Sequence, residues 1–265
     1  MRTLALLLIP VASSTFAATF ARTTTDDAQS GGSSVSIGLA GGVAPRYLGS
    51  KDYRPVIAPL LSAQAENGLF ASFPDGLGYR FSSSTGIFGS AALAYALGRE
   101  DHNRADLPGS DHLAGMGKIR GSVVNRLMLG YAVTDRLSVS GTVDIPLTHR
   151  ERGVMGNATV RYIAYQGPLD EIVVSGGLLL GNGRYNQSYF GVDAGQSARS
   201  GFQEYGMRGG PFAADVGLAW RHRFDRHWSL MNSLTVSTLI GNAAQSPIVE
   251  RRTSVLALTA VRYTF

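Results

Sequence analysis

The stretch "RLSVSGTVDIPLT", residues 136–148, decides the fold because its side chains alternate strictly between apolar and polar. One face carries Leu137, Val139, Val143, Ile145 and Leu147, and the other carries Ser138, Ser140, Thr142, Asp144 and Thr148. Successive side chains of a β-strand point to opposite faces, so this period of two predicts a strand whose faces meet two different environments.

Ten further runs repeat the pattern, and together they predict an all-β chain. They occupy residues 34–46, 54–66, 68–83, 86–97, 117–133, 153–166, 170–182, 212–224, 227–240 and 253–265. In the run 212–224, Phe212 and Val216 are expected on the apolar side, opposite Asp215. The short turn "DRH" at 225–227 predicts a tight antiparallel hairpin with the next run.

Three features favour a membrane barrel over a soluble sandwich. The runs reach or exceed the roughly 9 to 11 residues of a tilted membrane strand. Their polar faces are mostly Ser, Thr, Gly and Asn, as a hydrated lumen permits. Aromatic residues gather near strand ends, where a bilayer interface favours them: Tyr79, Phe81, Tyr162, Tyr165, Phe224, Trp228, Tyr263 and Phe265.

The strand count follows from closure of the barrel. Strands within lipid must satisfy all their backbone polar groups, so the sheet must close on itself, and bacterial single-chain barrels have an even number of strands. The turn signal "PDG" at 74–76 divides the run 68–83, which predicts an up-and-down barrel of twelve strands, with ten and fourteen as alternatives. Counting back from a periplasmic Phe265 puts the short turns inside and the connections 98–117, 183–210 and 241–252 outside.

The N-terminus predicts export. Residues 1–21 combine basic Arg2, an apolar core and small residues, so they read as a signal peptide cleaved after Ala17 or Ala21. Residues 22–33 read as a flexible periplasmic lead-in, and residues 34–265 as a single barrel domain. No stretch after the N-terminus approaches the roughly 18 apolar residues of a membrane helix.

Composition argues against other classes of function. The chain has no cysteine, which excludes disulfides, a thiolate nucleophile and cysteine metal sites. The net charge of +5 is carried by scattered basic residues, which argues against nucleic-acid binding. His102 and His112 share a polar loop with aspartates, but the pattern is typical of a solvated loop. Ser246 lacks the glycines of a nucleophile elbow. We therefore expect no enzyme, no cofactor and no metal site.

The central stretch "YFGVDAGQSARSGFQEY", residues 189–205, resembles the MipA/OmpV family of Gram-negative outer-membrane proteins. The elements "PRYLGSKDYRPVIAPL", "LGRED", "GNAAQSPIV" and the closing "YTF" agree in order, so the resemblance covers nearly the whole mature chain. The motif residues are Tyr189, Phe190, Gly191, Val192, Gln196, Ser197, Ala198, Ser200, Gly201, Ser246 and Pro247. The last strand is also similar to those of outer-membrane barrels in general, which commonly end on a phenylalanine that the barrel assembly machinery reads, so Tyr263 and Phe265 are expected to form a C-terminal assembly signal.

The resemblance implies a scaffold in the outer-membrane lipid that links a lytic transglycosylase with a peptidoglycan synthase. A passive channel for small solutes or antibiotics is the alternative, and a surface adhesin or antigen is a further one. The channel hypothesis rests on charges expected in the lumen: Arg126, Asp144, Arg161, Asp215, Arg221, Arg223 and Arg262. These charges could equally pair and seal the barrel. We further expect Tyr189 and Phe190 to continue or cap a strand, and residues 191–201 to fold inward and narrow the lumen.

Overall fold

The computed structural model describes residues 33–265. The predicted signal peptide, and the lead-in up to residue 32, lie outside the described residues.

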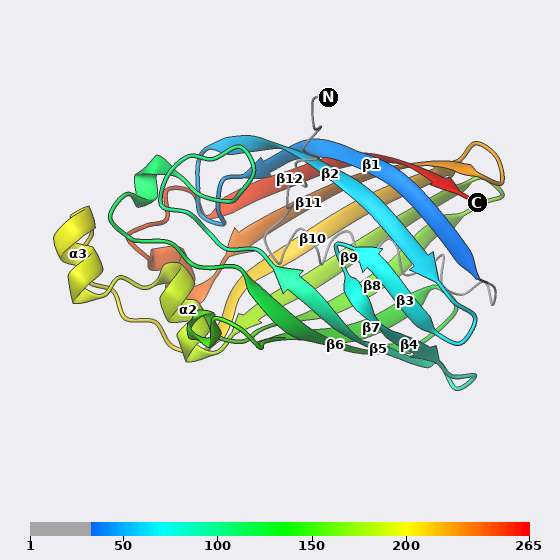
Figure 1. Cartoon of the computed structure of the whole chain (residues 1–265), viewed down its shortest axis with the longest axis horizontal. Coiled ribbons are helices and arrows are strands. Elements are labelled where there is room, and N and C mark those ends of the chain that lie inside the picture. Colours follow the sequence, from blue (N-terminus) through cyan, green and yellow to red (C-terminus); the bar gives the residue numbers. More distant parts are fainter. Residues whose placement is uncertain (1–32) are drawn as a thin grey trace, which may run out of the picture.

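Twelve antiparallel strands form a closed barrel in which each strand pairs with its neighbours in sequence and β1 pairs with β12 (Figure 1). The count of twelve is therefore confirmed, and so is the division of the run 68–83 into two strands. The strands are β1 (Ser34–Pro45), β2 (Tyr53–Gln64), β3 (Leu69–Phe73), β4 (Gly76–Ser82), β5 (Ile87–Ala96), β6 (Ser122–Ala132), β7 (Leu137–Pro146), β8 (Met155–Gln166), β9 (Asp170–Gly181), β10 (Gly210–Arg223), β11 (Trp228–Leu239) and β12 (Thr253–Thr264).

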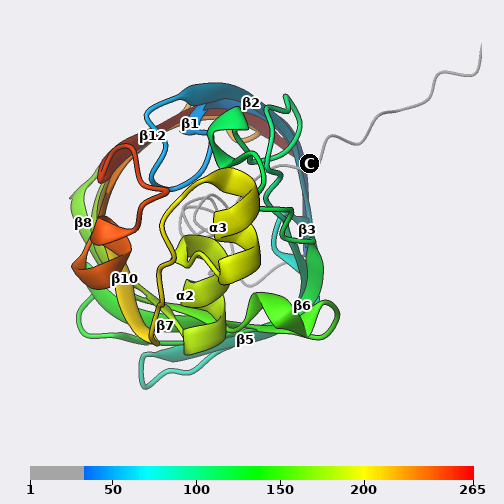
Figure 2. The ribbon, with the colours of Figure 1, turned by 90° about the vertical axis from the view of Figure 1, so that its left-hand side faces the viewer.

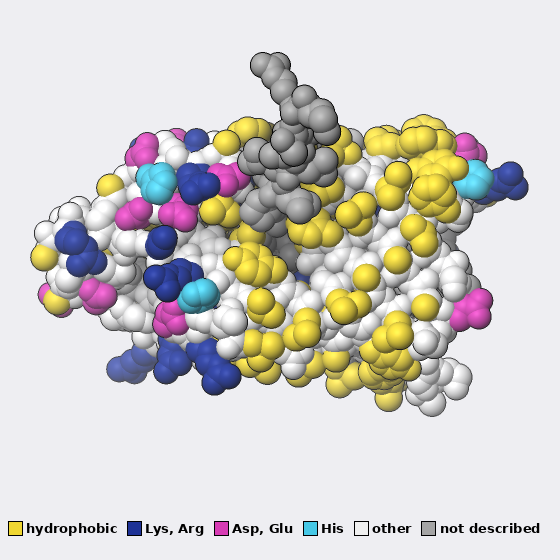
Figure 3. Space-filling view, in the orientation of Figure 1, with side chains coloured by type: hydrophobic (Ala, Val, Ile, Leu, Met, Phe, Trp, Pro, Cys, Tyr) yellow, Lys and Arg dark blue, Asp and Glu magenta, His cyan; other side chains and the backbone are white. Residues whose placement is uncertain are grey.

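The outer face of the barrel is apolar, as the alternating runs predict. In β7 the side chains of Val139, Val143 and Ile145 are exposed, whereas Asp144 between them is buried. Figure 3 shows hydrophobic side chains spread over the strands and charged ones gathered toward the ends of the molecule. Aromatic residues, among them Trp228 and Phe265, are exposed at the end that holds the C-terminus. Such a surface matches the apolar band and aromatic girdle of membrane barrels.

The two ends of the barrel differ in the length of their connections. Short turns join the strands at the end with the C-terminus, at residues 65–68, 83–86, 133–136, 167–169 and 224–227. The other end carries the connections 46–52, 97–121, 147–154, 182–209 and 240–252. The predicted arrangement of short turns at one end and long loops at the other is therefore confirmed.

The long connections contain the helices of the described residues. They are α2 (Gly183–Phe190), α3 (Ala194–Ser200) and the 3-10 helices η2 (Asp111–Leu113), η3 (Arg150–Arg152) and η4 (Gly241–Gln245). No helix among residues 33–265 is long and apolar enough to cross a membrane.

Two local expectations were wrong, the first of them in part. Of the expectation that Tyr189 and Phe190 continue or cap a strand, only the first half was wrong. They end helix α2, because the Asn182 side chain accepts a hydrogen bond from the backbone N–H of Tyr185 and starts the helix there, and Phe190 packs against strand residues. Phe212 does not face outward with Val216. A register shift between Pro211 and Ala213 turns its side chain into the interior, where it is 2% exposed.

Candidate functional site: a cap over one end of the barrel

The five long connections pack together into what we call the cap, which comprises residues 46–52, 97–121, 147–154, 182–209 and 240–252. Viewed along the barrel, α2 and α3 lie across the opening ringed by the strands (Figure 2). Two apolar clusters hold the cap together. One joins Tyr185 and Phe190 of α2 to strand residues such as Leu179 and Phe212, and the other gathers Tyr47, Leu113, Met116, Val192 and Ile248.

Tyr189 lies between two arginines that are each 4% exposed. Arg99 donates through Nη1 to the backbone carbonyl of Tyr189 at 2.7 Å, and Arg152 donates through Nη2 to its hydroxyl at 2.8 Å. Both guanidinium carbons lie within 6 Å of the ring centroid, at 5.6 and 5.9 Å. Burial raises the pKa of the Tyr189 hydroxyl, although both arginines oppose the shift. The two cations thus share one neutral aromatic partner.

Arg152 also ties the cap to the barrel wall. Its Nη1 donates to the Ala96 carbonyl at 2.8 Å and its Nη2 to the Leu97 carbonyl at 3.1 Å. A guanidinium presents several donors in one rigid plane, so a single side chain can join separate chain segments. Arg152 therefore links the connection 147–154 both to the end of β5 and to α2.

The central motif is held by capping and by contacts with other loops. The Asp193 carboxylate accepts from the Gln196 N–H at 2.8 Å, and the Gln196 side chain in turn accepts from the Asp193 N–H at 2.9 Å, which is a complete capping box for α3. The Gln196 side-chain amide also donates to the Met116 carbonyl at 2.9 Å. Gln196 therefore both starts α3 and fastens it to the connection 97–121.

The remaining motif residues have structural contacts of the same kind. Ser197 donates to the Phe202 carbonyl and Ser200 to the Gln196 carbonyl, both at 2.7 Å. Val192 exchanges backbone hydrogen bonds with Tyr205. Gly191 and Gly201 are the C-caps of α2 and α3, and Ala198 lies within α3. The segment stands at the outer tip of the molecule and not inside the lumen (Figure 1), so the expectation that residues 191–201 fold inward was wrong.

Ser246 and Pro247 join the same assembly from the last connection. Ser246 donates to the Phe190 carbonyl at 2.5 Å, and half-buried Pro247 lies between it and fully buried Ile248. The Ile248 carbonyl accepts from the Tyr47 hydroxyl at 2.6 Å, and burial raises the pKa of that hydroxyl above its usual range, with the nearby charge of Glu250 acting in the same direction. Ser246 is thus placed as a hydrogen-bond donor to the backbone.

Four of the charges expected in the lumen, Arg126, Asp144, Arg161 and Arg221, each lie near an opposite charge. Arg126 and Asp144, opposite one another on β6 and β7, form two parallel hydrogen bonds of 2.8 Å. Glu171 on β9 lies 3.7 Å from both Arg161 and Arg221, so one carboxylate is within reach of an arginine on β8 and an arginine on β10. Asp215 is 5% exposed. These contacts oppose unlike charges on neighbouring strands.

A pocket of about 190 Å³ opens at the end of the barrel that holds the C-terminus. It is lined by five arginines and only two acidic side chains: Arg80, Arg221, Arg223, Arg226, Arg262, Asp75 and Asp225. Of the acids, Asp225 accepts from two backbone N–H groups of its own turn. The pocket therefore has an excess of positive charge.

The histidines of the connection 97–121 do not form an acid–base pair with each other. His102 lies 3.3 Å from Asp101, whereas His112 packs against Phe202 and lies 3.6 Å from Glu250. Glu100, Asp101 and His102 could offer ligand atoms within 4.8 Å of one another, but an exposed acidic group of this kind is common without an ion.

Sequence analysis missed Arg99 and Arg152, which hold the centre of the cap. The only local signal is their position, since each lies a few residues from the end of a strand, in "LGRED" and "HRER". The capping box of Asp193 and Gln196 was the one signal from which α3 could have been predicted.

A closed barrel with an apolar outer face, a charged inner wall and a roof of packed loops is the fold of a membrane-spanning outer-membrane barrel protein. The family model described as "MltA-interacting protein MipA" matches residues 37–265. The chain belongs to the MipA family.

Solved barrels are similar in fold only. The translocator domain of the autotransporter NalP from Neisseria meningitidis is 9% identical, with a TM-score of 0.49 over 96% of this chain and 99% of that one. The NanC porin is 9% identical, with a TM-score of 0.46 over 86% and 98%. The toluene transporter TodX of Pseudomonas putida is 10% identical, with a TM-score of 0.40 over 97% and 95%. No curated protein matches the chain.

Proposed function

We propose that this chain is a capped outer-membrane barrel that acts as a scaffold, binding a lytic transglycosylase at its periplasmic end and linking that enzyme to peptidoglycan synthesis. The family description supports the interaction with the transglycosylase. The observation that carries the proposal is the packing of Arg99, Tyr189 and Arg152 in the cap, because a roof fixed by buried charge-assisted hydrogen bonds suits a closed structural barrel better than an open pore.

The docking surface in this proposal is the set of short turns at the end of the barrel with the C-terminus. The cap lies at the opposite end, so it cannot meet a periplasmic enzyme. Arg136 and Arg226 lie exposed on two of these turns, 133–136 and 224–227. Cationic side chains on a periplasmic rim are suited to an acidic patch on a partner, where they would raise the rate of association.

Two measurements test the scaffold. The purified barrel in a planar bilayer should pass no steady current, and the barrel should capture the transglycosylase from a purified mixture. Replacing Arg136 and Arg226 by glutamate should weaken capture, whereas Arg208→Glu in the cap, also exposed, should leave it unchanged. Capture that is equally weakened by Arg208→Glu, or absent in the unaltered protein, would contradict the scaffold.

A passive channel is the second candidate, and the arginine-lined pocket favours it. If the cap opened, the excess positive charge of Arg80, Arg223 and Arg262 at the inner end of the lumen would attract anions. The reversal potential in a salt gradient distinguishes the candidates. Stable, anion-selective steps from the unaltered protein would replace the scaffold with a channel.

A further inference from the structure

The wall of the barrel has one interruption in its strand pairing. β2 pairs with β3 only from Leu61 to Gln64, and β3 ends at Phe73. β4 begins at Gly76, and its pairing with β5 reaches only Leu93. Residues 53–60 of β2 thus have β1 as their only partner strand, and residues 94–96 of β5 have only β6. We call this interruption the seam; in Figure 1 the β3–β4 hairpin ends partway along β2.

Prolines occupy the positions of β2 where an unpaired N–H would face the seam. Ala65 donates its N–H to the Leu69 carbonyl, so odd-numbered residues of β2 direct their N–H toward β3. Pro55 and Pro59 are odd-numbered and have no N–H, which leaves Ile57 as the one donor of this edge between them. An unpaired N–H in hydrocarbon costs several kcal/mol, so the two prolines remove two such groups from this edge, while the carbonyls of the same residues still face the seam.

The outer rim of the seam is apolar. Ile57 on β2, Leu77 on β4, and Leu93 and Tyr95 on β5 are each more than half exposed. The seam therefore lies in the apolar band of the barrel, where its neighbours are lipid tails.

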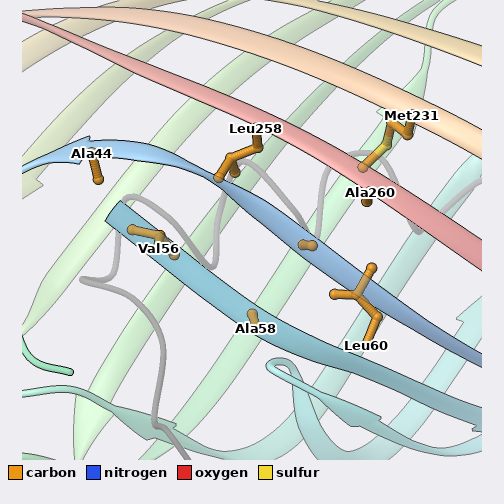
Figure 4. Close-up of a cluster of buried hydrophobic side chains, with 8 residues drawn as sticks. Ala44, Val56, Ala58, Leu60, Met231, Leu258 and Ala260 are labelled. Carbon is orange, nitrogen blue, oxygen red and sulfur yellow. The ribbon is translucent and has the colours of Figure 1, made fainter. Parts of the chain in front are cut away.

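Behind the seam, the inner wall carries an apolar stripe. Val56, Ala58 and Leu60 of β2 are buried on the inward face. The apolar surface that they form extends over neighbouring strands (Figure 4). The full stripe is Ala40, Ala44, Val56, Ala58, Leu60, Met231, Leu258 and Ala260. Inward faces of membrane barrels are normally polar, so an apolar stripe beside an interruption in the strand pairing suits an apolar occupant.

A buried cation lies at the end of the stripe nearest the cap. Arg54 is on the same inward face of β2, 4% exposed, and its Nε has no hydrogen-bond partner among the described residues. Its Nη1 makes one long bond, 3.4 Å, to the Ala105 carbonyl. A strand rises by about 3.3 Å per residue, so Arg54 stands about 20 Å from Leu60 along β2. A buried guanidinium with an unused donor calls for an anion.

We propose that the seam and the stripe form a lateral binding site for a single-chain anionic amphiphile of the fatty-acid class. The alkyl chain enters from the bilayer between β2 and β5 and lies along Val56, Ala58 and Leu60. The carboxylate meets the free donor of Arg54. The site does not depend on whether the barrel acts as a scaffold or a channel.

A photoactivatable long-chain fatty acid tests the site on the full chain in nanodiscs of neutral lipid, with cross-linked peptides mapped by mass spectrometry. Cross-links should concentrate on the inward residues of β2 and on β1 and β12. The fatty alcohol of the same length is the matched ligand without charge. Cross-links spread evenly over the outward face of all strands would overturn the proposal.

Two variants separate recognition of the head from recognition of the tail. Arg54→Gln should weaken fatty-acid binding about tenfold, as expected for loss of a charge-assisted hydrogen bond, and leave the alcohol unaffected. Ala58→Trp should block both ligands, while Ser140→Trp, an inward position on β7, which borders none of the strands of the stripe, should block neither. Circular dichroism and heat-modifiable gel mobility confirm that each variant is folded. Equal binding by folded Ala58→Trp and the unaltered protein would overturn the proposal.

Discussion

Arg152 and Tyr189, thirty-seven positions apart, meet through a hydrogen bond of 2.8 Å from the guanidinium Nη2 to the tyrosine hydroxyl. The same guanidinium holds two carbonyls at the end of β5. The side chain of Arg152 therefore connects the barrel wall, the connection 147–154 and the family motif. We expect the closed state of the cap to depend on this meeting point.

Replacing Arg152 by alanine should loosen the cap and let ions pass. The change leaves the Ala96 and Leu97 carbonyls without their buried donor, at about 1 to 3 kcal/mol for each unsatisfied group. Current steps in a planar bilayer are the measurement. Arg150→Ala is the control, because Arg150 is an exposed neighbour in the same turn of 3-10 helix. A silent Arg152→Ala barrel would show that the cap does not depend on this residue.

Gly153→Ala should be more damaging than Gly201→Ala. Both glycines have φ of +80°, which costs a residue with a side chain about 1 kcal/mol or more. A Cβ at Gly153 would in addition collide with the backbone of Tyr185, whereas one at Gly201 would meet nothing within 4 Å. Hydrogen exchange of α2 should rise clearly in the first variant and only slightly in the second. Equal effects would mean that backbone strain alone matters.

Acid should weaken the contact between the connections 46–52 and 240–252. Burial opposes ionisation of Glu250, but the hydrogen bond from Lys51 and the charge of His112 outweigh it and lower the pKa of Glu250. A lowered carboxyl pKa stabilises the folded form above the unfolded pKa of about 4.3, and this contribution is lost as the pH falls through the folded pKa.

Limited proteolysis of the cap from pH 7 to pH 3 measures this effect. Cleavage should rise in the most acidic range, and Glu250→Gln should be cleaved faster than the unaltered protein at pH 7, with a smaller further rise in acid. Proteolysis of Glu250→Gln that follows the same pH profile as the unaltered protein would assign the acid effect to other groups. A pepsin-class and a neutral protease are both needed to cover the range.

Breaking the Arg126–Asp144 pair should destabilise the barrel more than removing the whole pair. Among the described residues, Asp144→Ala leaves the buried guanidinium of Arg126 with Asp75, at 4.0 Å, as its remaining acidic neighbour, and the expected cost is about 3 to 5 kcal/mol. The double variant Arg126→Met with Asp144→Leu should recover most of the loss. Urea unfolding in lipid vesicles gives both values. A double variant less stable than Asp144→Ala would contradict this account.

The strands could be predicted from sequence because their signal is local. Alternation fixes which side chains share a face, and the turn at Pro74–Gly76 needed only three residues to divide one run into two strands. The arrangement of short turns and long loops followed from the count alone. Phe212 was misplaced because a single bulge reverses the face of every residue before it.

The cap could not be predicted in the same way. Several of its contacts join residues far apart in the chain, 37 positions for Arg152 with Tyr189 and 201 for Tyr47 with Ile248, and no period in the sequence encodes such a distance. The seam has a local trace in Pro55 and Pro59. That trace became interpretable only when the register showed which neighbour β2 lacks.

The hydrogen bond from Tyr47 to Ile248 joins the first external connection to the last. These connections border β1 and β12, the two strands whose pairing closes the barrel. The bond therefore cannot form while the cylinder is still an open sheet. During folding the roof would be the last part to form, and a surface that resists protease would mark a molecule whose barrel has closed.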